Sequence, residues 1–328
     1  MKAAVVIIIA ALLAGCGGNQ SALDPHGASS VALKDLIVLF ALICSVIWLL
    51  VTGFLLWAVM RRRAEARRDP AAERRMTVAV RASMTATVVI VAGLTVASFH
   101  TTQSLHSGAD APVFVSVKGQ QWWWQFTYRD GNQAPLFQTA NEIHIPVGKD
   151  VRLELESIDV IHSLWIPSLA GKLDLIPGRK NVLTLRADRP GTYRGQCAEF
   201  CGLQHGHMAL LVIAQDDSSY RQWVAAQAAP AAEPSDAEAA AGKAVFMSKP
   251  CAACHTVRGT PATGSSGPDL THVGGRQTIG AGLLETTRGS LAAWIADPQT
   301  LKPGNNMPLV PLTGEELRQL SAYMEGLR

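Results

Sequence analysis

Residues 197–208 read CAEFCGLQHGHM and gather two cysteines, a glutamate, two histidines and a methionine in one short stretch. The stretch alone allows a disulfide loop, a zinc site or a site that carries electrons. Structural zinc sites usually use CxxC pairs, whereas this spacing is CxxxC. A disulfide between Cys197 and Cys201 would leave the histidines and the methionine without a role. Thiolate, imidazole and thioether groups together form the soft ligand set that copper prefers.

The stretch closes a region, residues 112–215, that has the composition of a β-domain. Short β-branched or aromatic runs alternate in polarity and are separated by Gly, Pro, Asn and Asp. This pattern predicts an antiparallel β-sandwich or barrel. Two thiolates can hold two coppers, and a dinuclear site needs a second histidine. The same region offers His162, in the segment HSLWIP.

Together, HSLWIP and CAEFCGLQHGHM resemble the CuA domain of subunit II of the haem-copper oxidases, which has a cupredoxin-like all-β fold. The resemblance implies a dinuclear copper centre, CuA, with Cys197 and Cys201 bridging the two coppers. Its implied side-chain ligands are His162, Cys197, Cys201, His205 and Met208. The backbone carbonyl of Glu199 would be a further copper ligand. The carboxylate of Glu199 would help to bind Mg²⁺ at an interface with subunit I.

Other residues near these motifs are weaker candidates. GQQWWW, residues 119–124, resembles the aromatic patch of that family, which implies that Trp122 accepts electrons from a docked cytochrome c. Packing is the alternative role for any tryptophan. Asp159 and Asp174 are acids that could face a cationic donor or subunit I. His207 lies between the implied ligands and is expected to face solvent, and His144 is expected to be an ordinary strand residue.

A second motif, Cys251-Ala-Ala-Cys254-His255, has the spacing of covalent c-type haem attachment. Five residues alone could also be a redox or zinc CxxC motif. Met307, in NNMP downstream, supplies a thioether, and a Met/His axial pair is typical of an electron-transfer haem. Residues 238–328 resemble a class I cytochrome c, a small all-α domain. In that domain Gly242, Phe246, Leu320 and Tyr323 would form the contact between the first and last helices.

The Ala/Pro/Glu-rich residues 226–237 are predicted to be a linker that joins this domain to the copper domain, which spans 110–225. Within the linker, Ser235 followed by Glu238 matches a capping box and predicts a helix start.

The first 35 residues are predicted to be an export signal and a tether. Residues 1–15 read as a signal peptide, because a lysine precedes an apolar run that is short for a membrane span. The ending LAGC resembles a bacterial lipobox, so Cys16 would be the lipidated first residue of the mature chain. An ordinary signal peptide with an incidental cysteine is the alternative. Residues 16–35 are polar and predict an exported tether.

Two transmembrane helices are predicted next, at 36–60 and 76–99. The first carries no charge, and at ~1.5 Å per residue it can cross a hydrocarbon core of ~30 Å. The arginine-rich loop at 61–75 predicts a cytoplasmic turn. Both later domains would then lie on the periplasmic, outer face of the bacterial inner membrane. The oxidase family usually has a proton-uptake glutamate near a Trp and a Pro here, and the stretch ERRMTVAVRASMT, which begins at Glu73, contains neither.

The formal charge of +3 is too small for a nucleic-acid-binding protein. The motifs together are similar to caa-type cytochrome c oxidase subunit II, the electron-entry subunit of a terminal oxidase. The resemblance implies partners: subunit I, which reduces O₂ and pumps protons, subunit III, and a cytochrome c or quinol-cytochrome c reductase as donor. A CuA-containing subunit of a nitric oxide reductase and a membrane-tethered electron carrier without a catalytic partner remain alternatives.

Overall fold

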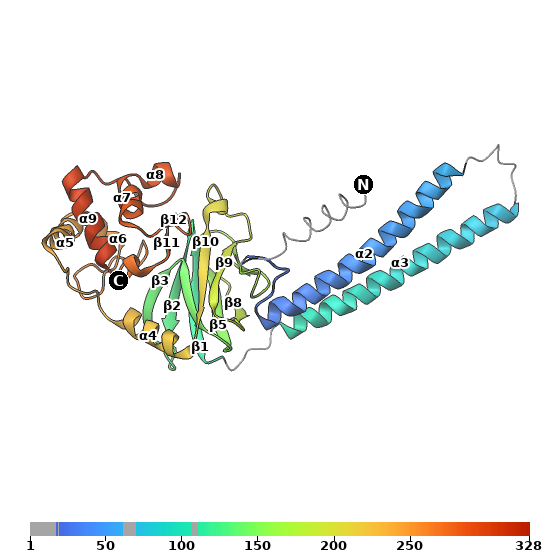
Figure 1. Ribbon diagram of the computed structural model, residues 1–328, viewed down its shortest axis with the longest axis horizontal. Coiled ribbons are helices and arrows are strands. Elements are labelled where there is room, and N and C mark those ends of the chain that lie inside the picture. The colour runs from blue at the N-terminus through green and yellow to red at the C-terminus, as the bar shows by residue number, and fades with distance from the viewer. Residues whose placement is uncertain (1–17, 19, 62–69, 106–110) are drawn as a thin grey trace, which may run out of the picture. The chain divides into compact units, whose positions relative to one another are not determined.

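The computed structural model describes residues 18, 20–61, 70–105 and 111–328 (Figure 1). The chain divides into two compact units, Val31–Ser107 and the combination of Met1–Ser30 with Gly108–Arg328. The predicted signal peptide and Cys16 lie outside the described residues, as does the middle of the arginine-rich loop.

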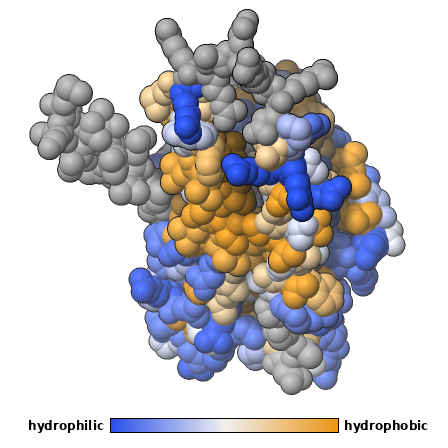
Figure 2. Space-filling view, turned by 90° about the vertical axis from the view of Figure 1, so that its right-hand side faces the viewer, coloured by the Kyte–Doolittle hydropathy of each residue, from blue (hydrophilic) through white to orange (hydrophobic). Residues whose placement is uncertain are grey.

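The smaller unit consists of two long helices, α2 (Ala28–Met60) and α3 (Pro70–Ser104). Both are long and apolar enough to cross a membrane. Their large apolar side chains point outward, as Trp48, Phe54 and Val88 do with 65%, 69% and 69% exposure. Figure 2 shows apolar residues gathered in an orange band. Such a surface matches a hydrocarbon environment rather than water.

Helix α3 begins earlier than the predicted span at 76–99. Pro70 starts the helix, where its fixed φ and missing N–H are tolerated, and Glu73 lies in the first turn. Part of the segment expected as loop is therefore the first turns of a helix.

The segment expected as a loose tether instead packs on the β-domain. The backbone N–H of His26 donates to the carbonyl of Ser168 at 2.7 Å, and the N–H of Asp188 donates to the carbonyl of His26 at 2.7 Å. Ser30 donates its hydroxyl to the carbonyl of Ser168 at 2.8 Å. Gly27 lies where a side chain would overlap the backbone of Arg186. The small polar residues thus allow close backbone contact rather than free motion.

The β-domain is a sandwich of two five-stranded sheets, with orders β3-β2-β1-β5-β8 and β4-β10-β9-β6-β7 (Figure 1). The strands are β1 (Val113–Gln120), β2 (Trp123–Arg129), β3 (Pro135–Ala140), β4 (Glu142–Pro146), β5 (Val151–Ser157), β6 (His162–Trp165), β7 (Leu173–Leu175), β8 (Asn181–Leu185), β9 (Gly191–Cys197) and β10 (Ala209–Gln215). The prediction of a wholly antiparallel domain is wrong, because β1 pairs with β5 and β4 pairs with β10 in parallel. Polarity alternation determines which face is buried and says nothing of strand direction.

The sandwich core fixes the positions of the strands that carry the site. In β5, every second residue is buried, with Val151, Leu153 and Leu155 at most 1% exposed. Burying each such side chain contributes roughly 1.5–3 kcal/mol. Trp124 on β2 is also fully buried, and its indole packs edge-on against His162 with 6.1 Å between ring centroids. The core and the predicted copper ligands are therefore in direct contact.

Helix α4 (Asp217–Ala228) ends the β-domain, and a small helical domain follows. Its elements are α5 (Ala237–Ser248), α6 (Cys251–Cys254), the 3-10 helix η3 (Val273–Gly275), β11 (Thr278–Ile279), β12 (Leu284–Glu285), α7 (Arg288–Ala296), α8 (Pro298–Leu301) and α9 (Gly314–Gly326). The short β11–β12 pair is an addition to the expected all-α domain.

Helices α5 and α9 cross at Gly242, where a side chain would overlap the carbonyl of Gln319. Phe246 packs edge-on against Tyr323, with ring centroids 6.0 Å apart. The expected contact of the first and last helices is therefore confirmed. The expected capping box is wrong, since Asp236 is the N-cap of α5 and accepts from the N–H of Ala239 at 2.8 Å. Asp236 lies one residue closer to the helix than Ser235.

Candidate metal centre and haem cleft

The predicted copper ligands converge at one end of the β-domain. His162 begins β6, Cys197 ends β9, and the other ligands lie in the loop before β10. The 3-10 helix η2 (His205–His207) forms part of that loop. Because β6 and β9 are neighbours in one sheet, with Leu164 opposite Cys197, residues distant in sequence meet at one place.

The donor atoms are spaced as ligands of shared metal ions. The Sγ atoms of Cys197 and Cys201 lie 3.8 Å apart, far beyond the ~2.05 Å of a disulfide. The Sγ of Cys197 lies 3.9 Å from the Nδ1 of His162 and 3.2 Å from the carbonyl oxygen of Glu199. The Sγ of Cys201 lies 3.6 Å from the Nδ1 of His205 and 3.9 Å from the Sδ of Met208.

Two ligands bound to one ion at ~2.0–2.3 Å lie about 3.3–4 Å apart, so these separations fit a metal centre. The donor set of two thiols, two imidazoles, a thioether and a carbonyl is soft and suits copper. The disulfide interpretation is thereby excluded for this conformation, and the metal interpretation is supported.

The two thiols resist losing both protons unless a cation is present. The hydrogen bond between them is the main cause that lowers the pKa of Cys197 to about 3, while burial opposes that shift. The same hydrogen bond and burial raise the pKa of Cys201. The first negative charge therefore disfavours the second at this short distance. A bound metal cation supplies the positive charge that the double thiolate needs.

His162 is oriented for metal binding through its Nδ1. Its Nε2 lies 2.8 Å from the carboxylate of Asp159, which can only accept, so Nε2 carries the proton. Burial tends to lower the pKa of His162, but the hydrogen bonds with Cys197 and Asp159 outweigh it and raise the pKa. Asp159 also accepts from the N–H of Gln121 at 2.6 Å. Asp159 therefore orients a metal-binding imidazole, a role that carboxylates often have beside metal sites.

Two tryptophans, one in strand β2 and one in the turn before it, donate hydrogen bonds to the ligand loop. The indole Nε1 of Trp122 donates to the carbonyl of Cys201 at 3.0 Å, and the Nε2 of Gln121 donates to the same carbonyl at 2.7 Å. The indole of Trp124 donates to the carbonyl of Met208 at 3.4 Å. Trp122 is only 8% exposed, so it is a buried neighbour of the centre rather than an open surface patch.

Several sequence candidates lie outside the ligand cluster. The side chain of Glu199 is exposed and pairs with Lys172 at 3.4 Å. Among the described residues, the cluster that could hold a metal contains His162, Cys197 and Cys201, and it does not include the carboxylate of Glu199. The side chain of His207 is exposed, as expected. His144 is a buried strand residue that stacks on Trp223 with ring centroids 3.9 Å apart.

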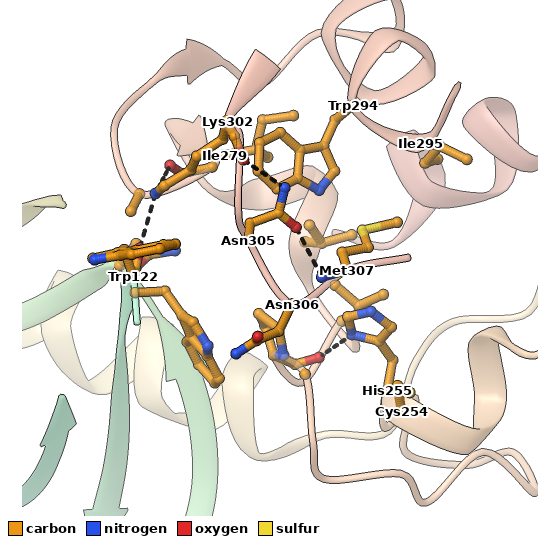
Figure 3. Close-up of a pocket in the computed structure, with 18 of the residues that line it drawn as sticks. Trp122, Cys254, His255, Ile279, Trp294, Ile295, Lys302, Asn305, Asn306 and Met307 are labelled. Atoms are coloured by element: carbon orange, nitrogen blue, oxygen red, sulfur yellow. Dashed lines mark hydrogen bonds between the residues drawn. The ribbon is translucent and has the colours of Figure 1, made fainter. Parts of the chain in front are cut away.

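The second site is a largely apolar cleft between the helical domain and the β1–β2 turn of the β-domain, with about 1180 Å³ of empty space open to solvent. Cys254, His255 and Met307 line it (Figure 3). Cys251 and Cys254 lie at the two ends of the single turn α6, and both are free thiols. Residues three apart on a helical turn lie on the same face, so both thiols are neighbours.

In His255, as in His162, one ring nitrogen is held by a hydrogen bond and the other is left for a metal. Its Nδ1 donates to the carbonyl of Pro268 at 2.8 Å, which leaves Nε2 as the free acceptor. Gly267 lies against the ring, where an added Cβ would be 2.5 Å from Cε1. Burial lowers the pKa of His255, so the imidazole is kept neutral, as an iron ligand must be.

The loop that carries Met307 is held by amide side chains. Asn305 accepts from the N–H of Met307 at 2.8 Å, and Gln299 donates to the carbonyls of Asn305 and Met307, both at 2.8 Å. The thioether is therefore on a fixed segment at the cleft. A covalent haem fits this donor set, with two thiols for attachment and an imidazole and a thioether for the iron.

Two buried charged residues near the sites were not predicted from sequence. Glu142 is 5% exposed and accepts from the N–H of Gln277 at 2.8 Å. Lys302 is 2% exposed, and burial lowers its pKa to about 7, an effect that Cys201 opposes. Each residue has an ordinary sequence context, and the burial arises only from contacts between distant segments.

Comparison with known proteins identifies the two domains. Residues 130–215 match the family model for the cytochrome c oxidase subunit II periplasmic domain, and residues 239–328 match that for cytochrome c. The chain is 35% identical to "Cytochrome c oxidase subunit 2" of Alkalihalophilus pseudofirmus, over 96% of this chain and 94% of that protein. It is 34% identical to the protein of the same name from Bacillus sp. PS3, over 66% and 62% of the two chains.

A solved structure is also similar, that of the periplasmic domain of subunit II of cytochrome oxidase from Bradyrhizobium japonicum. The match has 29% identity and a TM-score of 0.34, and it covers 36% of this chain and 94% of that one.

The fold and the two sites define a membrane-anchored protein with a periplasmic copper domain and a haem domain, built for electron transfer. Such proteins serve haem-copper oxidases. The chain belongs to the cytochrome c oxidase subunit II family, in a form that carries its own cytochrome c domain. It is thus a component of a terminal oxidase, and its family implies association with subunit I.

Proposed function

We propose that this chain is the electron-entry subunit of a terminal cytochrome c oxidase. In this proposal electrons reach the helical domain first, pass to the β-domain and continue to subunit I, where O₂ is reduced and protons are pumped. The convergence of six donors from two separate segments, with neighbouring donors 3.2 to 3.9 Å apart, supports this function above all. When bound, the copper and the haem supply reversible one-electron chemistry.

In the copper domain, the proposal assigns a dinuclear CuA centre to the ligand cluster. Cys197 and Cys201 would bridge the two ions, while His162 and His205 would each serve one. Met208 and the carbonyl of Glu199 would complete the set. The hydrogen bonds from Trp122 and Gln121 to the carbonyl of Cys201 support a loop that moves little between oxidation states. A rigid loop reduces the structural cost of gaining and losing an electron.

In the helical domain, Cys251 and Cys254 would hold a covalent haem c. The Nε2 of His255 and the thioether of Met307 would bind its iron. The hydrogen bond to Pro268 keeps the imidazole in the tautomer that this requires. A Met/His pair favours the reduced iron and gives a high potential. With His255 and Met307 both holding the iron, this domain would relay electrons.

The proposal places both domains on the outer face of the bacterial inner membrane, with helices α2 and α3 as the anchor. Lipidation of Cys16 would add a second anchor. The partners would be subunit I, subunit III and a cytochrome c or quinol-cytochrome c reductase as donor. The Mg²⁺ site at Glu199 stays a prediction, because its carboxylate pairs with Lys172 in this conformation.

Spectra of the full chain, purified in detergent after expression with haem c maturation and copper, test the proposed function. We expect a low-spin c-type haem spectrum together with a mixed-valence copper EPR signal. Metal analysis should give two coppers and one iron per chain. A haem spectrum without the copper signal would refute the assignment of the β-domain ligands.

The Met307→His substitution is expected to lower the haem potential. Imidazole donates more strongly than thioether, so the change should be on the order of 0.1 V, within the ~0.8 V range that axial ligands cover. A spectrally monitored redox titration measures it. Met247→His is the matched control, since Met247 packs at the edge of the helical core. An unchanged potential in the Met307 variant would exclude Met307 as a ligand.

A further inference from the structure

Lys302 is a buried lysine whose ammonium is surrounded by backbone carbonyls. It follows helix α8 and lies near Trp122 (Figure 3). Its Nζ donates to the carbonyls of Trp122 at 2.8 Å, His207 at 2.6 Å and Gly280 at 2.9 Å. An ammonium has three donors, and here each has an acceptor. Among the described residues no carboxylate pairs with it. Burying a lysine without a paired acid costs free energy, so the burial of Lys302 needs an explanation.

The three carbonyls belong to three segments that are far apart in the sequence. Trp122 lies in the turn between β1 and β2, beside the copper ligand loop, and His207 lies between two of the predicted copper ligands. Gly280 lies in the helical domain. Lys302 itself is on the segment that leads to Met307. One side chain therefore joins the loop of the copper centre to the loop of the haem cleft.

Other contacts across the same boundary surround this ammonium. The N–H of Ala209 donates to the carbonyl of Ala281 at 3.0 Å, and the Nε2 of Gln204 donates to the carbonyl of Pro303 at 2.9 Å. The carboxylate of Glu142 accepts from the N–H of Gln277 at 2.8 Å. Each domain thus supplies one buried charged residue that bonds to backbone groups of the other.

The backbone at Gly304 also lies against the indole of Trp122. A Cβ added there would be 3.5 Å from the ring, which is ordinary van der Waals contact. The indole in turn donates to the carbonyl of Cys201. The helical domain therefore covers the aromatic residue that adjoins the copper centre.

We propose that Lys302 is a positioning residue that locks the haem-bearing domain onto the copper loop and fixes the path of electron transfer between them. Its ammonium donates one hydrogen bond each to Trp122, to the segment at His207 and to the haem-domain turn at Gly280. Electron transfer falls steeply with distance, so a fixed contact keeps the two sites in one productive geometry. This inference rests on the proposed function for the role of the contact.

Lys302→Met tests the lock, because methionine keeps an apolar stem of similar length and removes all three donors. Lys243→Met is the matched control, since Lys243 is in the same domain and pairs with Glu233 at 2.6 Å, away from the boundary. The full chain in detergent is used in both cases. The readouts are hydrogen–deuterium exchange of individual amides, the relaxation of the copper EPR signal by the neighbouring haem, and the rate of haem-to-copper electron transfer.

We expect Lys302→Met to keep both the haem spectrum and the copper signal. The amides of Ala209 and Gln277, which donate across the boundary, should exchange at least about tenfold faster, because three carbonyls have lost their donor. The amide of Cys197 bonds to Met208 within the copper domain and should not change. The haem-induced relaxation should weaken, and the transfer rate should fall by at least about tenfold. Lys243→Met should behave as the wild type.

Unchanged exchange at Ala209 and Gln277 in Lys302→Met would overturn the inference. If that variant loses either spectrum, Lys302→Gln replaces it, since glutamine keeps two donors and should give an intermediate exchange rate. Loss of a spectrum in both variants would also overturn the inference, because Lys302 would then be needed for the sites to form. Absence of the copper signal in the wild type is a separate result, which would refute the proposed function instead.

Discussion

Replacing Cys197 with serine is expected to abolish the copper centre and leave the haem attached. The serine hydroxyl keeps its proton and offers a hard oxygen, so the proposed thiolate ligand would be lost. The copper EPR signal should disappear, and O₂ consumption by the assembled oxidase should fall by more than ~100-fold, beyond what losing an outer-shell residue costs. The haem spectrum should persist, because Cys251 and Cys254 lie in the other domain.

Cys44→Ser is the matched control for that experiment. Cys44 is an exposed free cysteine on helix α2, far along the chain from the ligand loop. This variant should keep both the copper signal and the activity. Loss of copper and haem together in Cys197→Ser would point to misfolding rather than to a lost ligand.

Replacing Gly242 with valine is expected to unfold the haem domain or destabilise it by at least ~3 kcal/mol, the upper range for overpacking. The Cβ would overlap the backbone carbonyl of Gln319, and a backbone atom cannot move aside as a flexible side chain can. Helices α5 and α9 would have to separate, which would expose Phe246 and Tyr323. Denaturant unfolding, followed by the haem absorbance, measures the change.

Ala244→Val controls for the β-branched residue itself. Ala244 is exposed on the same helix, so only its lower helix propensity should matter, at roughly 0.5 kcal/mol. Equal stability of the Gly242 and Ala244 variants would contradict the close helix crossing. The expected losses of unfolding free energy differ clearly between the two variants, so one denaturant titration of each distinguishes them.

The residues of both proposed sites could be picked out from the sequence because their chemistry is local. Five of the six proposed copper donors lie within residues 197–208, and the haem motif spans five residues. His162 is distant, but the segment around it has its own pattern. The strand pattern likewise indicated a sandwich, since polarity alternation is a local property. It could not give the parallel pairing of β1 with β5, which depends on how the chain crosses between strands.

Features that arise from long-range contact could not be predicted. Lys302 lies in TLKPG, which has the composition of an exposed turn, and only the packing of two domains buries it. The segment before Ala28 has the composition of a tether, yet His26 bonds to the backbone at Ser168 and Asp188. In both cases the partner is a backbone group, and a backbone carbonyl leaves no mark on the amino-acid sequence.

The cover over Trp122 has a kinetic consequence. Helix α4 ends at Ala228 and helix α5 begins at Ala237, so a short connection links the domains. Short tethers give effective concentrations on the order of mM, which an outside protein rarely reaches. With the indole 8% exposed, a free carrier competes poorly for that face. In the proposed path, salt and dilution should therefore slow only the step in which a carrier meets the haem domain. The transfer from the haem domain to the copper domain should be independent of protein concentration.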